Sequence, residues 1–412
     1  MHHFEYRDGV LFAEEVSVTK LTENYGTPLY IYSAATFRRH FKAFDSAFDG
    51  LDHLTCFSVK ANSNLSVLRM LAEEGAGMDI VSGGELYRAL KAGVAPEKIV
   101  YSGVGKRESE IRDALSAGIL MFNVESVAEL IKIDEVAGLK GVKAQVSFRI
   151  NPDVDPQTHP YISTGMAKNK FGLDIENSFK AYEMAAKLDN IEPVGMDCHI
   201  GSQLTSIEPF LEALDKLLDF YEKLKGIGIK IKYLDLGGGL GIPYDEEQPP
   251  HPTEFGQALS AKLKGLPLKV ILEPGRVIAG NAGIMVTKVL YTKSNPTKNF
   301  LIVDAAMNDL VRPSLYGSYH RIGEVEEHGR APMVYDVVGP ICESGDFLAR
   351  DRELPGIKQG ERLVLYSAGA YGFTMSSNYN TRPRACELIV DDDKVIVARK
   401  RETYEDIVAN EL

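Results

Sequence analysis

Short apolar and β-branched runs alternate with segments of helical periodicity from about residue 55 onward. The runs predict strands, because such residues favour a pleated, half-buried surface. The segments between them carry apolar residues at helical spacing and often end in glycine, which is typical of helices. The alternation repeats eight times, and the runs are, in order, TCFSVK, GMDIV, KIVYSG, LMFNVE, AQVSFRINP, VGMDCHIGS, YLDLGGGLG and KVILEPGR.

Strands that alternate with helices pair in parallel through right-handed crossovers, which leaves an open doubly wound sheet or a closed (β/α)8 barrel. Eight units in about the length of a typical barrel favour closure, and we expect the barrel to span residues 36–278. Barrel enzymes build their sites where the carboxyl ends of the strands meet. The polar residues at or near these ends are Lys60, Asp79, Asn123, Arg149, His199, Gly237, Gly238, Gly239, Glu273 and Arg276.

The pattern changes after about residue 280 to strands and turns without long helices. Runs such as AGIMVTKVLYTKS, MVYDVVGPIC and KVIVARKRE predict a mainly antiparallel β domain. The extended runs VLFAEEVSV and PLYIYS near the start of the chain are expected to complete it. The predicted β domain therefore comprises residues 1–35 and 279–412.

Composition narrows the class of partner. With 412 residues, of which 44% are hydrophobic, the chain is long enough for two globular domains. Its net charge of −12 opposes broad attraction to nucleic acid or to an anionic membrane, so a small-molecule partner is expected. No apolar run is long enough to span a bilayer. The cysteines lack metal-ligand spacing, which predicts neither a metal site nor a disulfide framework and fits a reducing cytoplasm; they are Cys56, Cys198, Cys342 and Cys386.

Lys60 follows an apolar run in FSVKANSN, where a solvated lysine at a strand end is the ordinary interpretation. In ILEPGR, Glu273 could bond a protonated ring nitrogen and Arg276 could clamp an anion, although a weak surface ion pair between them is an alternative. The three glycines of LDLGGGLGIP either bind a phosphate through their N–H groups or make a tight turn. They do not fit the G-x-G-x-x-G fingerprint of a dinucleotide fold.

Two further motifs complete the candidate chemistry. HIGSQ adds the imidazole of His199 and the hydroxyl of Ser202 at another strand end. GPICESGDFL joins Cys342 to two acids, although an isolated cysteine is usually buried and structural. Together these residues point to pyridoxal phosphate as cofactor. They offer a lysine for a Schiff base, an acid for a pyridine nitrogen, glycines for a phosphate and an arginine for a substrate carboxylate.

The order of FSVKANSN, HIGSQ, DLGGGLGI, EPGR, RPSLYGSYH, GPICESGD and GAYG resembles the diaminopimelate decarboxylases, in the alanine racemase-like class of pyridoxal phosphate enzymes. The resemblance runs from about residue 25 to the C-terminus. It implies decarboxylation of meso-2,6-diaminopimelate to L-lysine, the last step of lysine biosynthesis. It also implies a cytoplasmic homodimer with shared active sites.

The resemblance assigns a role to each motif. Lys60 would form the Schiff base, Glu273 would bond the pyridine nitrogen and His199 would stack on the ring, whereas Cys342 would donate a proton from the partner subunit. The cofactor phosphate would be held by Ser202, Gly237, Gly238, Gly239, Pro274, Gly275, Arg276 and Tyr371. The substrate would be bound by Arg276, Arg312, Tyr316, Glu343 and Tyr371.

Several alternatives stay open. The same machinery could decarboxylate ornithine, arginine or a carboxylated polyamine, but their cationic ends would favour an acid in place of Arg312. An amino-acid racemase shares the barrel and the lysine, but Glu273 strengthens the electron sink and so favours decarboxylation. A noncatalytic relative would be expected to lose Lys60 or Cys342. The roles of Asp79, Arg149 and His159 are not assigned, since ordinary ion pairing would equally explain the first two.

Overall fold

The computed structural model describes residues 2–155 and 170–411, which form two compact units. One unit comprises Phe41–Ile242 and Gln248–Val277, and the other comprises Met1–His40, Pro243–Glu247 and Ile278–Leu412. We call them the barrel unit and the β unit.

Eight parallel strands close on themselves in the barrel unit, because the last pairing in the strand order joins β8 to β9. This confirms the predicted (β/α)8 barrel. A short ninth strand, β10 (Leu173–Asp174), pairs with β9 outside the ring. The eight strands are β5 (His53–Ser58), β6 (Gly77–Ile80), β7 (Ile99–Tyr101), β8 (Met121–Val124), β9 (Ala144–Asn151), β11 (Ile191–Asp197), β12 (Tyr233–Asp235) and β13 (Lys269–Leu272).

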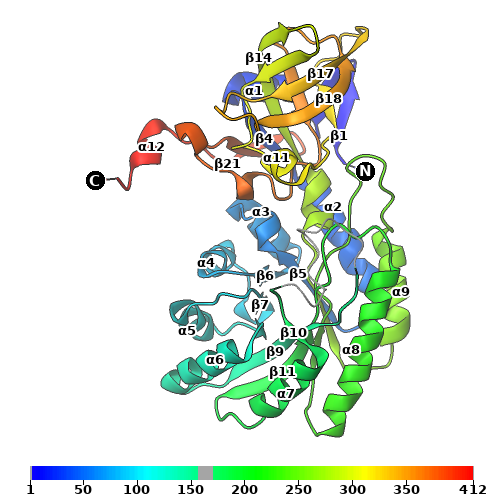
Figure 1. The fold of residues 1–412 in the computed structure, drawn as a ribbon, viewed down its shortest axis with the longest axis vertical. Helices are drawn as coiled ribbons and strands as arrows, with labels where there is room; N and C mark the ends of the chain where they lie inside the picture. Colours follow the sequence, from blue (N-terminus) through cyan, green and yellow to red (C-terminus); the bar gives the residue numbers. More distant parts are fainter. Residues whose placement is uncertain (1, 156–169, 412) are drawn as a thin grey trace. The chain divides into compact units, whose positions relative to one another are not determined.

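Helices cover the outside of these strands (Figure 1). Their ends follow the sequence signals: the Ser82 hydroxyl caps α4 and the Ser126 hydroxyl caps α6, and both helices end at a glycine in the left-handed conformation. The helices along the barrel are α2 (Ala34–Asp45), α3 (Leu65–Glu73), α4 (Gly83–Ala92), α5 (Glu108–Ala117), α6 (Val127–Lys140), α7 (Ile175–Ala185), α8 (Glu208–Gly226), α9 (Pro252–Leu263) and α10 (Arg276–Ala279). Among the described residues, no helix is long and apolar enough to cross a membrane.

Along several strands the barrel interior changes from apolar to polar. Cys56, Val100, Met121 and Ile271 belong to one buried apolar cluster. Side chains two residues apart point to the same side of a strand. The next inward positions are therefore the buried polar residues Ser58, Ser102, Asn123 and Glu273. The polar end of the interior is thus the carboxyl end, where a barrel places its site.

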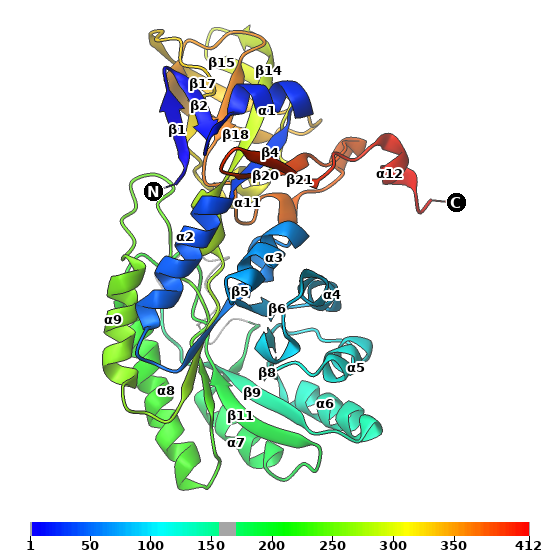
Figure 2. The same cartoon turned by 180° about the vertical axis from the view of Figure 1, so that it is seen from behind.

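The β unit is mainly antiparallel, as predicted (Figure 2). Its main sheet runs β18-β17-β15-β14-β4-β20-β21, with β19 also beside β14 and β16 beside β19; β1, β2 and β3 form a separate sheet. The strands are β1 (Phe4–Arg7), β2 (Val10–Ala13), β3 (Val16–Ser17), β4 (Leu29–Ser33), β14 (Gly283–Ser294), β15 (Asn299–Val303), β16 (Ile322–Glu324), β17 (Pro332–Val338), β18 (Phe347–Pro355), β19 (Arg362–Leu365), β20 (Cys386–Asp391) and β21 (Lys394–Arg399).

Both extended runs near the start of the chain form strands: PLYIYS supplies β4 of the main sheet, and VLFAEEVSV supplies β2 and β3 of the separate sheet. β4 lies between β14 and β20, pairing antiparallel with the first and parallel with the second. Helix α1 (Val18–Tyr25) was not predicted, and β15 pairs in parallel with β17. The helices after residue 280 are short, as expected: α11 (Arg312–Tyr316) and α12 (Tyr404–Val408).

Candidate active site

Lys60 lies in a single 3-10 turn, Val59–Ala61, directly after β5. Its Nζ is 2.5 Å from Oδ2 of Asp79, which is fully buried on the neighbouring strand β6. Ser58 donates a hydrogen bond to the same carboxylate oxygen at 2.9 Å. A buried acid therefore holds the amine in the barrel mouth, although 37% of the Lys60 side chain is exposed, so the lysine is paired and only partly solvated.

Glu273 follows β13 and is buried, with its Oε1 3.3 Å from both the Ser102 hydroxyl and the Asn123 amide nitrogen. The Asn123 side-chain nitrogen also donates to Asp235, and the Asn123 side-chain oxygen accepts a hydrogen bond from the Ser147 hydroxyl. Glu273 thus sits in a network of donors inside the barrel, and the interpretation of a surface ion pair with Arg276 is wrong.

Two further acids lie beside Glu273. Carboxylate oxygens of Asp197, Asp235 and Glu273 all lie within 4.8 Å of one another. Burial and the neighbouring acids raise the pKa of Asp197 and Glu273 well above the usual range, and they raise the pKa of Asp235 to about 8. The cluster therefore retains protons at neutral pH, and Glu273 would ionise most readily beside a cation.

The three glycines hold three loops together at close range. A Cβ on Gly238 would lie 2.1 Å from the Glu273 carbonyl oxygen, and one on Gly239 would lie 2.5 Å from the Gly201 carbonyl oxygen. Gly237 and Gly239 also have positive φ, which confirms the tight turn. The N–H of Gly237 donates to Asp235 and that of Gly238 to His199 Nδ1, so both donors already have partners within the protein.

The HIGSQ loop lies against this glycine turn. His199 accepts the Gly238 N–H at 3.1 Å, and burial with the nearby Arg149 charge lowers its pKa well below the usual value, so its imidazole is neutral. Arg276, buried at the start of α10, donates to the Ser202 hydroxyl at 3.1 Å. A guanidinium and a hydroxyl thus meet beside the glycine turn, a donor set that suits a phosphate.

Arg149 and Asp79, whose roles the sequence did not assign, both have charged partners in the structure. Arg149 forms an ion pair with buried Glu125 at 3.1 Å and donates to the His199 carbonyl, and Asp79 pairs with Lys60. Both therefore form ion pairs, and that of Arg149 is buried on both sides. His159 lies outside the described residues.

The β unit carries the other predicted residues. Arg312, buried at the start of α11, donates to His320 Nε2 at 3.0 Å, and its guanidinium lies 4.6 Å from the centre of the Tyr244 ring. His320 Nδ1 lies 2.9 Å from the Tyr366 carbonyl oxygen, so Nδ1 carries the ring proton. Arg312 and Tyr316 occupy the first and last positions of α11.

Cys342 is exposed, whereas the other three cysteines are buried, so the interpretation of a buried structural cysteine is wrong. The loop that carries Cys342 and Glu343 is joined to α11 through the Ser314 hydroxyl, which donates to the Gly345 carbonyl at 2.6 Å. Tyr371 adopts φ of 55°, an uncommon conformation for a residue other than glycine and one that is enriched at functional sites.

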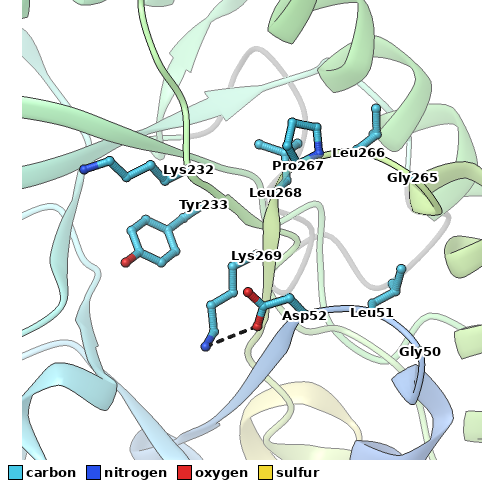
Figure 3. Close-up of a pocket in the computed structure, with 10 residues that line it drawn as sticks. All are labelled: Gly50, Leu51, Asp52, Lys232, Tyr233, Gly265, Leu266, Pro267, Leu268 and Lys269. Atoms are coloured by element: carbon cyan, nitrogen blue, oxygen red, sulfur yellow. Dashed lines mark ion pairs between the residues drawn. The ribbon is translucent and has the colours of Figure 1, made fainter.

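A pocket of about 410 Å³ lies at the opposite end of the barrel (Figure 3). It is lined by residues at the amino ends of β5, β12 and β13, among them Asp52, Lys232 and Lys269. Lys269 and Asp52 form an ion pair of 3.4 Å with side chains that are 36% and 71% exposed. Because barrel sites form at carboxyl ends, this pocket is not the candidate active site.

Comparison with known proteins decides the family. A family model described as the pyridoxal binding domain of pyridoxal-dependent decarboxylases matches residues 34–280. A diaminopimelate decarboxylase of Aquifex aeolicus is 54% identical over 407 residues, which cover 98% of this chain and 96% of that protein. The chain belongs to the diaminopimelate decarboxylase family. The Pseudomonas aeruginosa diaminopimelate decarboxylase is 53% identical, covering 100% of this chain and 99% of that one.

Solved structures agree with this assignment. Helicobacter pylori diaminopimelate decarboxylase complexed with L-lysine matches with a TM-score of 0.92 and 44% identity, covering 95% of this chain and 98% of that one. The M. jannaschii diaminopimelate decarboxylase in complex with L-lysine has a TM-score of 0.93 and 41% identity, covering 100% and 99%. The chain is therefore a carboxy-lyase of lysine biosynthesis, and its family implies pyridoxal phosphate as cofactor.

The residues at the barrel mouth fit that cofactor. The Lys60 amine suits its aldehyde, and the buried acid Glu273 suits its ring nitrogen. The neutral imidazole of His199 suits the ring face, and the guanidinium and hydroxyl of Arg276 and Ser202 suit the phosphate. The glycine turn leaves no room for a Cβ beside them. Sequence reasoning missed Ser58, Ser102, Asp197 and Asp235, although an acid inside an apolar run such as VGMDC or YLDLG is itself a signal.

Proposed function

We propose that the chain converts meso-2,6-diaminopimelate and a proton into L-lysine and carbon dioxide, with pyridoxal phosphate bound at Lys60. The observation that carries the proposal is the likeness to diaminopimelate decarboxylases over the whole chain, together with the buried Asp79 that holds the Lys60 amine. When bound, the cofactor supplies an electron sink for the pair left by carbon dioxide.

In the barrel unit, the Glu273 carboxylate would accept a hydrogen bond from the protonated ring nitrogen of the cofactor. The positive charge on that nitrogen would keep the Glu273 carboxylate ionised. The imidazole of His199 would lie against the ring, its orientation fixed by the Gly238 N–H. The phosphate would take hydrogen bonds from the Arg276–Ser202 pair. Since Gly237 and Gly238 have used their N–H groups within the protein, we propose that they act by shape, and that Gly239, Pro274, Gly275 and Tyr371 complete the phosphate site.

In the β unit, Arg312 would bind the distal carboxylate of the substrate, with Tyr316 as a further donor. Arg276 of the barrel unit would be the third donor to this carboxylate. The contact of Arg312 with His320 supports this role, because a guanidinium whose orientation is fixed can make directed, charge-assisted hydrogen bonds to a carboxylate. Glu343 would bind the distal amino group, and Tyr371 would contact both substrate and phosphate. Cys342 would give the proton that replaces the departing carboxylate.

We propose that the enzyme is a cytoplasmic homodimer in which Cys342 and Glu343 serve the site of the neighbouring subunit. The exposure of Cys342 supports this arrangement. Mixing inactive Lys60→Ala and Cys342→Ala proteins after subunit exchange should restore about a quarter of the wild-type activity, since half the dimers would carry one intact site. Absence of any recovery would contradict shared sites.

The reaction itself is tested by incubating the holoenzyme with meso-diaminopimelate and measuring L-lysine and carbon dioxide. We expect equal amounts of both, and none from Lys60→Ala. Entry of solvent deuterium into recovered substrate without loss of carbon dioxide would show racemisation instead and would refute the proposal.

A further inference from the structure

We call residues 342–346 the CESGD loop. A three-residue turn in the β unit, Tyr379–Thr381, contacts both proposed active-site residues of this loop. The Asn380 side-chain oxygen accepts the backbone N–H of Cys342 at 2.8 Å. The Tyr379 hydroxyl donates to Glu343 Oε2 at 2.9 Å. We propose that this turn positions Cys342 and Glu343 for the decarboxylation, Asn380 by fixing the backbone at the thiol and Tyr379 by fixing the carboxylate.

The backbone of the turn supports a functional role. Asn380 and Thr381 both have positive φ, at 55° and 56°. Such a conformation costs residues with a Cβ free energy, and asparagine is among those that tolerate it best. Two consecutive residues therefore hold a disfavoured conformation that brings the Asn380 carboxamide to the Cys342 N–H.

Within its own chain, the CESGD loop needs such contacts because the rest of the β unit does not cover it. Cys342 and Glu343 are both exposed in the single chain, so packing within their own subunit does not hold them. The base of the loop is fixed separately: Asp346 accepts the N–H of Ile341 at 2.8 Å and that of Met307 at 2.7 Å. Between these anchors, the turn supplies the contacts to the two residues that would act on the substrate.

The two contacts predict different kinetic effects. Loss of the Asn380 bond would displace the proton donor, so kcat would fall while KM stays nearly constant. Loss of the Tyr379 bond would release the carboxylate that binds the distal amino group, so KM would rise while kcat stays nearly constant. This inference rests on the proposed roles of Cys342 and Glu343.

Asn380 offers a matched pair of variants. Glycine accepts positive φ but has no acceptor, whereas aspartate tolerates the conformation and keeps one. In the holoenzyme we expect Asn380→Gly to lower kcat about two- to tenfold, the range of one ordinary hydrogen bond, and Asn380→Asp to stay near wild type. Tyr379→Phe, which removes only the hydroxyl, should raise KM for meso-diaminopimelate by a similar factor.

Amide hydrogen exchange at Cys342 reports the contact without reference to activity. We expect exchange of this N–H to be several-fold faster in Asn380→Gly than in Asn380→Asp. Equal exchange and equal kcat in the two variants would overturn the positioning role. If Cys342→Ala kept full kcat, the proposed proton donor would be wrong instead, whatever the exchange result at Asn380.

Discussion

Lys106 provides a test of how the barrel supports its polar interior. Its side chain is only 1% exposed, and its Nζ lies 2.7 Å from Glu129 Oε1, 2.8 Å from the Asn123 carbonyl oxygen and 2.9 Å from the Gly103 carbonyl oxygen. Asn123 in turn donates to Glu273. Replacing Lys106 by methionine keeps the shape of the chain but leaves the Glu129 carboxylate, 8% exposed, without its cation.

The size of the effect follows from the distance. Two unit charges 2.7 Å apart attract by about 6 kcal/mol at an effective dielectric constant of 20. Desolvation of both groups offsets part of this attraction, and removal of one member of a buried pair costs about 3–5 kcal/mol. We therefore expect Lys106→Met to lower the free energy of unfolding by about 3–5 kcal/mol at neutral pH.

The pH dependence has a definite sign. Burial raises the pKa of Glu129, which the Lys106 charge partly offsets. Without the Lys106 charge, the pKa of Glu129 in the folded protein rises further above its value in the unfolded chain. The stability lost by Lys106→Met therefore grows as the pH rises from the unfolded-state pKa of Glu129 through its folded-state pKa. At low pH Glu129 is protonated in both states, and the deficit of Lys106→Met should shrink.

Urea unfolding followed by circular dichroism measures these differences in Lys106→Met, Glu129→Gln and the double variant. The double variant removes the uncompensated charge, so it should lose at least about 2 kcal/mol less than the sum of the single losses. Strictly additive losses, or a loss below about 1 kcal/mol in Lys106→Met, would refute the assignment of a buried, coupled pair.

Three further predictions concern the site. Gly238→Ala places a Cβ 2.1 Å from the Glu273 carbonyl oxygen, so it should lower the free energy of unfolding by about 1–3 kcal/mol and weaken retention of the cofactor. The control Gly226→Ala, whose Cβ meets no atom within 4 Å, should show neither effect. Urea midpoints measure the stability and absorbance of the bound cofactor measures its retention; equal behaviour of the two variants would contradict the steric argument. His320→Ala removes the group that holds Arg312, so KM for meso-diaminopimelate should rise more than kcat falls; steady-state kinetics that showed an unchanged KM would exclude this role. Burial raises the pKa of Glu85 from 4.5 to about 7. The stability of the wild type relative to Glu85→Gln should therefore fall as the pH rises from about 4.5 and level off above about 7. Thermal unfolding of both proteins measures this, and a stability difference that stayed constant between these pH values would be inconsistent with the shift.

The sequence predicted the architecture because its periodicity reports which face of each element is buried. The barrel, the antiparallel domain and the contribution of β4 from the start of the chain were all predicted. Helix α1, VTKLTENY, was missed, because its eight residues carry few apolar positions and so show little helical periodicity. The parallel pairing of β15 with β17 depends on contacts between distant segments, which local patterns do not encode.

The site was predicted in its motifs but not in its support. Asp197 and Asp235 were overlooked because each follows an apolar run that periodicity explains without them. The contact between Asn380 and Cys342 joins residues 38 positions apart and has no sequence signal. The use of the Gly237 and Gly238 N–H groups within the protein likewise depends on folded loops. What the sequence omitted are partners brought together only by the fold.

The most direct measurement of the central claim is release of carbon dioxide and amine product by the purified holoenzyme from a panel of meso-diaminopimelate, ornithine, arginine and lysine. We predict that only meso-diaminopimelate is turned over, giving L-lysine and carbon dioxide in equal amounts. Turnover of a cationic substrate in its place would overturn the role of Arg312, and absence of lysine from meso-diaminopimelate would contradict the proposed reaction.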